Sequence, residues 1–256
     1  PFQGTYYYTR ASANIRFSKR NPYIIMYCII FGYGKMGKAI ESILLKQGHS
    51  VIATIDNETE LNENEDIFDT ADMAFEFSTP STAYNNIKTC LKHKLPVVCG
   101  TTGWDDKLVE IKSICGDENA LLYAPNFSIG INIFLNINAQ LSKIVDSLNL
   151  YEINIEETHH IHKKDAPSGT ALEIKRTINE SMTNKSDIEI TSHKEGEVVG
   201  IHEVTYTSLL DTIEFRHTAK TRDAFAYGAV MAANFLIDKK GIFNMQDVIK
   251  SLYICK

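Results

Sequence analysis

Short, mostly apolar runs punctuate the first half of the chain from residue 26 onward, and each run ends at a glycine, a proline or a polar residue. Runs of this length are typical of buried strands in a parallel sheet. Helical spacing of apolar residues follows the first run and ends at Gly48, and a second amphipathic stretch covers about 82–93. The alternation predicts an α/β fold with a parallel sheet. The expected strands lie at 27–31, 51–55, 73–77, 95–99 and 121–124.

The second half of the chain changes to strands in which apolar and polar residues alternate, the pattern of a sheet with one buried face. The expected strands are 151–157, 187–192, 197–207 and 212–218. A helix is expected at about 170–178. A further helix is expected at 225–236, where alanine and glycine recur and allow close packing.

A glycine-rich turn separates the first strand from the first helix and matches the pattern GxGxxG. Gly32 permits the tight turn, Gly34 lets a pyrophosphate approach the backbone, and Gly37 lets helix and strand pack closely. The N-terminus of the helix presents free N–H groups to the phosphates. The strand, turn, helix and second strand together predict dinucleotide binding, against the alternative of a turn that serves packing alone. The candidate cofactor-binding residues of this turn are Gly32, Tyr33, Gly34, Lys35, Met36 and Gly37.

The second strand ends at Asp56, which lies 19 positions after Gly37. A carboxylate near this spacing is expected to accept the ribose hydroxyls. It would repel the 2′-phosphate of NADPH, and the next residue, Asn57, brings no positive charge. Lys35 would offset this repulsion in part. The sequence therefore predicts NADH or NADPH as cofactor, with NADH favoured.

Three further loops follow expected strands of the parallel sheet. Ligands bind at the carboxyl ends of such strands, which makes these loops candidates for the cofactor site. The alternative for each loop is ordinary turn chemistry. Trp104, the single tryptophan, is expected to serve packing. The candidate residues are Phe77, Ser78, Gly100, Thr101, Thr102, Ala124, Pro125, Asn126 and Phe127.

Histidines concentrate between the alternating strand at 151–157 and the helix at 170–178: three of the eight lie at 159, 160 and 162. His160 and His162 would face one way on a strand and could bind a metal, but no third ligand is suitably spaced. Alternatively, one histidine donates a proton near neutral pH. Ser168, Gly169 and Thr170 open a helix and form a cradle for an anion. We therefore interpret this loop as a binding site for a small, multiply anionic substrate, in preference to the alternative of a solvated polar loop without function. No metal is predicted.

Composition excludes several classes of protein. The chain has 26 basic and 32 acidic residues and a formal charge of −6, so a nucleic-acid partner is not expected. No apolar run reaches the roughly 18 residues of a membrane helix, so no membrane association is expected either. The five cysteines show no CxxC spacing. Free, mostly buried thiols in a reducing cytoplasm are expected.

Residues 1–25 form an unusual N-terminal segment with four basic residues and no acid. A signal peptide does not fit, since the apolar stretch continues into the glycine turn and is better used as a strand. A transit peptide and a non-native extension remain, and a non-native extension before a natural start at Met26 is favoured. The segment is expected to be poorly ordered.

The string His159-His160-x-His162-Lys163-x-Asp165-x-Pro167-Ser168-Gly169-Thr170-Ala171 resembles the signature of the 4-hydroxy-tetrahydrodipicolinate reductase (dihydrodipicolinate reductase) family of the bacterial and plant lysine pathway. Other segments are similar to the family as well, in order, from Met26 to the C-terminus. They are Gly34-Lys35-Met36-Gly37, residues 76–80, 100–103 and 124–130, Gly200-Ile201-His202, and the stretch from Arg216-His217 to Arg222.

The resemblance implies a Rossmann-like nucleotide-binding domain plus an α+β substrate and oligomerisation domain with a mixed sheet, assembled as a homotetramer in the cytoplasm, or in a plastid if residues 1–25 are a genuine transit peptide. It implies NAD(P)H-dependent reduction of 4-hydroxy-tetrahydrodipicolinate to tetrahydrodipicolinate with loss of water, in the diaminopimelate route to lysine. His159 would donate the proton and Lys163 would be the second catalytic donor. The small dicarboxylate substrate would be bound by His160, Ser168, Gly169 and Thr170.

The chain departs from the family pattern at four places. Phe31 stands at the first glycine position of a longer glycine motif, Lys35 replaces Arg, Glu76 replaces Asp, and Lys194-Glu195-Gly196 stands where Arg-x-Gly is common. These changes bear on cofactor preference rather than on the reaction. Two other functions stay open: another two-domain NAD-dependent oxidoreductase, and a non-catalytic NAD-binding sensor. The expected nucleotide-binding domain comprises 26–126 and 222–256, with the substrate domain at 127–221.

Overall fold

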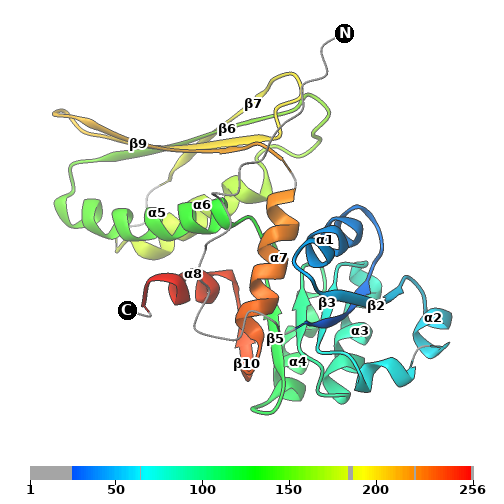
Figure 1. The fold of residues 1–256 in the computed structure, drawn as a ribbon. Coiled ribbons are helices and arrows are strands. Elements are labelled where there is room, and N and C mark those ends of the chain that lie inside the picture. Colours follow the sequence, from blue (N-terminus) through cyan, green and yellow to red (C-terminus); the bar gives the residue numbers. More distant parts are fainter. Residues whose placement is uncertain (1–24, 64, 184–186, 222, 255–256) are drawn as a thin grey trace, which may run out of the picture.

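We describe the protein from a computed structural model, which places residues 25–63, 65–183, 187–221 and 223–254. The expectation that residues 1–25 are poorly ordered falls almost entirely outside these described residues. Two sheets organise the described chain (Figure 1). No helix within the described ranges has both the length and the apolar character needed to cross a membrane.

The first sheet has six strands, and all its pairings are parallel. The glycine turn follows its β1 strand, which lies between β3 and β2, so the turn and the ends of β3 and β4 open at one edge of the sheet. The predicted parallel sheet is therefore confirmed. In spatial order the strands are β10 (Gly241–Phe243), β5 (Ala120–Tyr123), β4 (Val97–Cys99), β3 (Met73–Glu76), β1 (Tyr27–Phe31) and β2 (Ser50–Ile55).

Helices cover both faces of this sheet, and each face has its own apolar core. Since both faces are covered, the central strands are buried along their whole length, as their continuous apolar runs predict. One core lies under α1 (Lys35–Lys46), α7 (Asp223–Leu236) and α8 (Met245–Ile254). The other lies under η2 (Glu65–Asp69), α3 (Pro80–Lys92) and α4 (Leu108–Cys115), with Leu61 of α2 (Glu58–Glu63) at its margin, and η3 (Asp105–Lys107) leads into α4.

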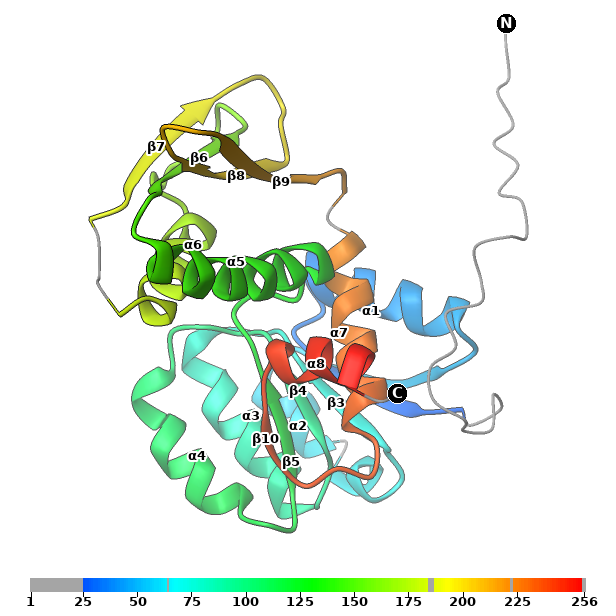
Figure 2. The ribbon, with the colours of Figure 1, turned by 90° about the vertical axis from the view of Figure 1, so that its left-hand side faces the viewer.

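The second sheet is mixed, as the fold expectation requires. Its order is β7-β6-β8-β9, with β6 and β7 parallel and the other pairs antiparallel. Two helices pack on one face, and Figure 2 shows them between the two sheets. The elements are α5 (Ile129–Leu148), β6 (Glu152–His159), α6 (Gly169–Ser181), β7 (Glu189–Lys194), β8 (Gly200–Thr207) and β9 (Thr212–Ala219).

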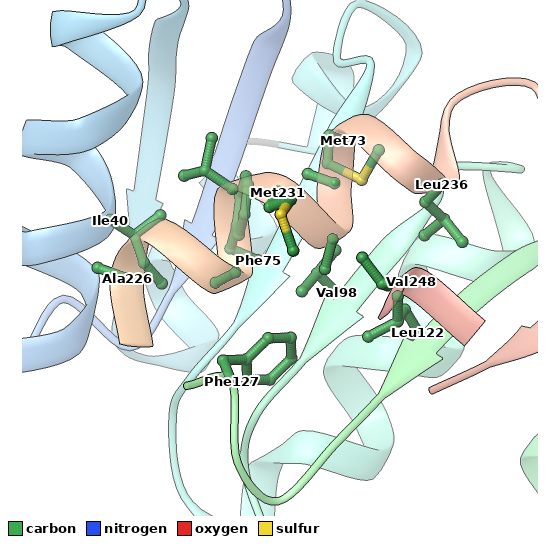
Figure 3. Packing of buried hydrophobic residues seen from close by; sticks show 14 of the residues in the cluster. Ile40, Met73, Phe75, Val98, Leu122, Phe127, Ala226, Met231, Leu236 and Val248 are labelled. Carbon is green, nitrogen blue, oxygen red and sulfur yellow. The ribbon is translucent and has the colours of Figure 1, made fainter. Parts of the chain in front are cut away.

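After β9 the chain returns to the first sheet through α7, which packs on α1 and on strands β4 and β5. Figure 3 shows Ala226, Met231 and Leu236 of this helix against Phe75, Val98 and Leu122 of the sheet. The small residues of α7 permit this approach: a Cβ on Gly228 would lie 1.8 Å from the carbonyl oxygen of Phe127. The helix thus ties the first sheet to the segment that leads into α5.

Several elements were not predicted from the sequence: helices α2, α4, α5 and α8, the 3-10 helices η2 and η3, and strand β10. Helix α5 carries buried residues at helical spacing from Ile131 to Val145, and Ser128 caps it by accepting a hydrogen bond from the Ile131 N–H. Strand β10 has only three residues, too few for a periodic signal, and adds to the sheet by pairing with β5. Helix α8 packs on α5 and α7.

The cysteines and the tryptophan are placed as expected. Cys28, Cys90, Cys99 and Cys115 are free and buried, while Cys255 lies outside the described residues. Burial raises the pKa of the Cys28 thiol to about 12, so this thiol stays protonated and unreactive. Trp104 is buried, and its indole N–H donates to the carbonyl oxygen of Thr101 at 2.7 Å, which anchors the loop after β4.

Candidate functional site: two clefts that share Met36

Two clefts adjoin at the side chain of Met36, the second residue of α1. The first, of about 280 Å³, lies at the edge of the parallel sheet, and Phe77, Ser78, Pro80, Gly100, Thr101 and Thr102 complete its lining. The second, of about 320 Å³, lies between the two sheets. Its lining comprises Met36, Asn126, Ser128, Ile131, His159, Thr170, Val199, Gly200, His202, His217, Ala219 and Phe225. Molecules bound in the two clefts would therefore meet at the side chain of Met36.

The glycine turn next to the first cleft has the geometry of a phosphate-binding loop. Gly32 has a φ of +85°, and a Cβ there would lie 2.3 Å from the carbonyl oxygen of Phe77. A Cβ on Gly37 would lie 2.3 Å from the carbonyl oxygen of Gly32. At Gly34, the N-cap of α1, no side chain caps the helix and the space a Cβ would enter is open. The uncapped helix end and the open approach therefore fit the pyrophosphate of a dinucleotide.

Asp56 lies beside the same turn, as its spacing predicts. Its carboxylate accepts a hydrogen bond of 2.6 Å from the N–H of Tyr33, which joins the end of β2 to the turn. A second carboxylate was not predicted at this place: Glu60 Oε2 accepts from the Asp56 N–H at 2.7 Å, and Glu60 Oε1 accepts from the Asn57 side chain. Two carboxylates therefore lie where the adenosine ribose of a dinucleotide is expected.

A buried carboxyl group, that of Glu76, holds the loops of the first cleft. Glu76 is the last residue of β3 and is 0% exposed. Its Oε1 accepts from the N–H and the hydroxyl of Ser78 and from the amide of Asn86, and its Oε2 accepts from the thiol of Cys99. Every contact comes from a neutral donor, so Glu76 fixes the loop after β3 to the end of β4.

The segment at 124–127 divides between the second cleft, the surface and the core. Ala124 and Phe127 are buried, and the ring of Phe127 packs at 5.5 Å from that of Phe77. Pro125 is exposed, whereas Asn126 lines the second cleft and its amide reaches the Thr170 hydroxyl at 3.5 Å. Of these four candidates, Asn126 alone lines a cleft.

The second cleft is built around the end of β6. His159, the last residue of this strand, lines the cleft, and its Nδ1 lies 3.4 Å from Glu157 Oε2. His202, on β8, lies opposite Glu157 in the strand register, and its Nε2 is 3.6 Å from the same oxygen. The two imidazole rings meet edge to face with centroids 5.1 Å apart. One carboxylate oxygen therefore faces two histidines.

Burial sets the protonation of these groups. Desolvation lowers the pKa of His202 to about 4, with a further lowering from His159, so His202 is neutral at neutral pH. Desolvation also lowers the pKa of His159, and the charge of Glu157 opposes that change. Burial pushes the pKa of Glu157 upward, but hydrogen bonds from Ser168 and Ser192 outweigh it and the net pKa lies below its ordinary value. Glu157 is consequently an anion beside two neutral histidines.

The N-terminus of α6 forms one wall of the second cleft. Ser168 caps this helix by accepting from the Ala171 N–H, and its own N–H donates to Glu157 Oε1 at 2.8 Å. Gly169 and Thr170 are the first helical residues, so their N–H groups have no partner within the helix. Thr170 lines the cleft. The predicted anion cradle therefore adjoins His159.

Lys163, His160 and His162 lie outside the lining of either cleft. The Lys163 ammonium donates to both oxygens of Asp165 at 2.8 Å and its side chain is 22% exposed. His162 pairs with Glu197 at the surface. The Lys194-Glu195-Gly196 turn supports this loop, since the Glu195 N–H donates to the carbonyl oxygen of His159.

Three polar residues of the second cleft region were not predicted as site residues: Glu157, His202 and His217. The alternation of apolar and polar residues along β8 could have indicated His202, because it shares the buried face with Val204 and Tyr206. Among the described residues, Glu157, His159 and His202 are the one trio whose ligand atoms lie close enough for a metal, within 4.8 Å. His160 and His162, the two histidines that the sequence offered as metal ligands, do not belong to this trio.

Comparison with known proteins places the chain in a family. The family models for the N-terminus and the C-terminus of dihydrodipicolinate reductase match residues 26–127 and 130–249. The 4-hydroxy-tetrahydrodipicolinate reductase of Christiangramia forsetii is 42% identical over 236 residues, covering 88% of this chain and 98% of that protein. The protein of that name from Thermosipho africanus is 36% identical over 222 residues, covering 86% and 96%.

Solved structures agree on the fold. A dipicolinate-bound dihydrodipicolinate reductase from Paenisporosarcina superposes with a TM-score of 0.70 at 20% identity, covering 86% of this chain and 98% of that one. An amine dehydrogenase from Mycobacterium smegmatis superposes with a TM-score of 0.62 at 11% identity, covering 89% and 97%. The chain belongs to the dihydrodipicolinate reductase family, the NAD(P)H-dependent oxidoreductases of the diaminopimelate route to lysine.

Proposed function

We propose that this protein reduces 4-hydroxy-tetrahydrodipicolinate to tetrahydrodipicolinate, with loss of water, at the second cleft. The observation that carries the proposal is the junction at Met36: a cleft beside a dinucleotide loop meets a cleft that holds both His159 and the N-terminus of α6. Reduction of this kind needs a hydride on one side of the substrate and a proton and anion-binding groups on the other. The two clefts supply these requirements from opposite sides.

The substrate is a dicarboxylate, and the wall formed by α6 suits one carboxylate. The free N–H groups of Gly169 and Thr170 and the Thr170 hydroxyl are donors at the positive end of a helix dipole. Dipicolinate, bound in the solved relative, is a dicarboxylate of the same class. We assign Ser168 a different part: its hydroxyl and N–H serve the helix cap and Glu157, so it shapes the cradle rather than contacting substrate.

The hydroxyl group leaves as water together with a proton from a neighbouring ring carbon of the substrate, and the reduction that follows consumes one hydride and one proton. When bound, the nicotinamide cofactor supplies the hydride. His159 donates the proton to the enamine carbon that hydride addition leaves. In the free protein, burial holds the pKa of His159 below its ordinary value. A bound dianion would raise that pKa by favouring the charged imidazolium, so substrate binding itself would promote the protonation of His159.

Lys163 is assigned the role of second donor, although in the ligand-free protein its ammonium is held by Asp165. A substrate carboxylate that enters the cleft offers a competing anion for this ammonium. Because the Asp165 side chain is 60% exposed, water screens its pairing with Lys163, and the ammonium can exchange Asp165 for a substrate carboxylate at little cost. His160 borders the same loop and is assigned to substrate binding.

We assign NADH as the preferred cofactor. Asp56 and Glu60 place two carboxylates beside the expected ribose, and a 2′-phosphate there would meet like charges. Lys35 is the nearest basic residue in the glycine turn sequence and offsets this repulsion in part. The remaining candidates of the first cleft, which are Phe77, Ser78, Gly100, Thr101 and Thr102, are assigned to the nicotinamide end.

The proposed domain division is 26–126 with 222–256 for the nucleotide and 127–221 for the substrate. It is supported by the return of α7 onto the first sheet, although residue 222 itself lies outside the described residues. The homotetramer and the cytoplasmic location stay predictions.

A coupled assay tests the proposal. A synthase makes the substrate in place from pyruvate and aspartate semialdehyde, and oxidation of NADH, then of NADPH, is followed by loss of absorbance. We expect turnover with both cofactors and a higher kcat/KM for NADH. A strong NADPH preference would contradict the roles of Asp56 and Glu60. Tight NADH binding without turnover would favour another substrate or a sensor.

A further inference from the structure

The carboxylate of Glu157 is buried and only half satisfied. The residue is 2% exposed, yet it carries a charge. Its Oε1 accepts the Ser168 N–H at 2.8 Å and the Ser192 hydroxyl at 2.7 Å. Its Oε2 is buried without a hydrogen bond and faces the Nδ1 of His159 and the Nε2 of His202. A buried carboxylate oxygen is costly unless a donor reaches it, so the imidazoles are its natural partners.

Strand register puts this carboxylate where it is. Glu157 is paired with Ser192 of β7 on one side and with His202 of β8 on the other, and His202 is in turn paired with His217 of β9. A polar row thus crosses the sheet. Since alternate residues of a strand share a face, Glu157 and His159 project to the same side of β6. This row therefore brings Glu157 and His202 next to the ring of His159, the proposed proton donor.

We propose that Glu157 is a positioning residue that fixes the tautomer and orientation of His159, holding its Nδ1–H so that Nε2 faces the substrate. The proposal rests on the proposed function, in which His159 is the proton donor. Nε2 lies on the cleft side of the ring: it is the atom nearest to a Cβ built on Gly200, at 3.2 Å, and Gly200 lines the cleft.

The tautomer matters because only the Nδ1–H form of neutral His159 can take up and release a proton at Nε2. With Nδ1–H facing Glu157, neutral His159 has a free electron pair on Nε2 that can take up and give back a proton at the cleft. The positive charge formed during this cycle lies beside the anionic Glu157. In the opposite tautomer the electron pair of Nδ1 would face a carboxylate oxygen of Glu157. Both atoms are hydrogen-bond acceptors, so this arrangement is unfavourable.

Other charged groups around His159 do not replace this effect. From the loop after β6, Lys163 disfavours the imidazolium and Asp165 favours it, and His160 disfavours it slightly. From β8, His202 is neutral. Lys194 of β7 is its register partner, and His217 of β9 and Asn126 and Thr170 complete the polar surroundings in the cleft. Glu157 is the anion nearest the ring, and it acts on the nitrogen opposite the substrate.

Glu157 also joins the proton donor to the anion cradle. Through the Ser168 N–H it holds the residue that caps α6, and through Oε2 it faces His159. His159 and the free N–H groups of Gly169 and Thr170, which follow the capping residue, must contact the same substrate molecule. One carboxylate thus sets the spacing between them.

Glu157→Gln is the test, because glutamine keeps the shape and can keep the bonds from Ser168 and Ser192 through its carbonyl oxygen. Its NH₂ group then faces the Nδ1 of His159 and demands the opposite tautomer. We expect kcat to fall by about 10–100-fold, in the range of other variants that disturb an orienting carboxylate. The loss should grow with pH, because the decline of kcat at rising pH moves to lower pH when the anion is removed.

The matched control is Glu156→Gln. Glu156 is the preceding residue of β6 and points to the opposite face, and its Oε2 lies 3.9 Å from the Nε2 of another histidine, His193, on the surface. Its removal should leave both kcat and the pH profile unchanged. Glu157→Asp keeps the charge and should keep the position of the pH decline while lowering kcat.

A readout independent of turnover separates the proposal from the proposed function. Nitrogen NMR of histidine-labelled protein, without substrate, should show neutral His159 as the Nδ1–H tautomer in the wild type and as Nε2–H in Glu157→Gln. An Nε2–H wild-type tautomer would overturn the proposal even if the enzyme is active. A pH-independent fall in kcat, with unchanged tautomer, would overturn it as well and leave Glu157 a purely structural residue.

Discussion

The two clefts that share Met36 differ in what lines them. The first is lined by glycine, serine, threonine, proline and phenylalanine, with no titratable side chain. The second contains three histidines, at 159, 202 and 217, and burial lowers the pKa of each. The first cleft therefore works through shape and backbone geometry, and the second through charge.

A buried glutamate stands behind each cleft, and the pair makes the difference plain. Glu76 accepts from hydroxyl, amide, N–H and thiol donors on both oxygens. Glu157 accepts two hydrogen bonds on one oxygen and turns the other to imidazoles. The same residue type, on a strand of a sheet in each case, anchors a loop in one place and meets titratable groups in the other. Substitutions on the first side should act independently of pH, and those on the second should not.

The largest effect is expected from His159→Gln. Removal of the proton donor should lower kcat by about 10²–10⁴-fold, the usual range for a general acid. Affinity for NADH, measured by fluorescence titration, should stay the same because the dinucleotide turn is untouched. His162→Gln, on the exposed part of the same loop, serves as control and should retain full turnover. Undiminished activity of the His159 variant would remove the chemical role from the second cleft.

The next effect is on stability and follows from His202. Its pKa is about 4 in the folded protein and 6.5 ordinarily, so the unfolded chain takes up a proton over this interval and the folded chain does not. Stability must then decrease as pH falls from about 6.5 towards 4, by on the order of 3 kcal/mol. Glu157 acts in the same direction, since its lowered pKa gives stability that acid removes.

Urea unfolding at about pH 7 and about pH 4.5 measures this loss. His202→Gln should flatten the difference between the two conditions, whereas the exposed His193→Gln should leave it as in the wild type. If the free energy of unfolding changed equally between the two pH values in all three proteins, His202 would have an ordinary pKa. The second cleft would then not be distinguished from the first by its titratable groups.

The smallest effect, and the sharpest contrast of shape with charge, is expected in the glycine turn. Gly32→Ala adds a Cβ 2.3 Å from a backbone oxygen at a φ of +85°, so it should cost about 1–3 kcal/mol of stability and weaken NADH binding. Gly34→Ala meets open space, so it should leave the melting temperature unchanged and weaken NADH binding alone. Neither loss should vary with pH. Normal NADH binding by Gly34→Ala would show that the phosphates do not approach there.

Much of the first sheet could be predicted because its signals are local. Continuous apolar runs gave strands β1 to β5 within two residues at each end, and the GxGxxG turn was recognisable from its own glycines. Strand β10 could not be predicted, because three residues carry no period and its place depends on pairing with β5. Glu60 was missed for a similar reason, since its bond to the Asp56 N–H appears only when the first turn of α2 has formed.

The sequence by itself determined the histidine cluster, the glycine turn and the family resemblance, because each depends on residues that are neighbours along the chain. The tertiary structure decided which histidine does what. It brought His202 from β8 against Glu157 and left His162 at the surface, although His162 is much closer in sequence to His159. The physical reason is strand register: pairing of β6 with β7 and β8 places Ser192, Glu157 and His202 in one row, and no local pattern specifies which residues will be opposite one another.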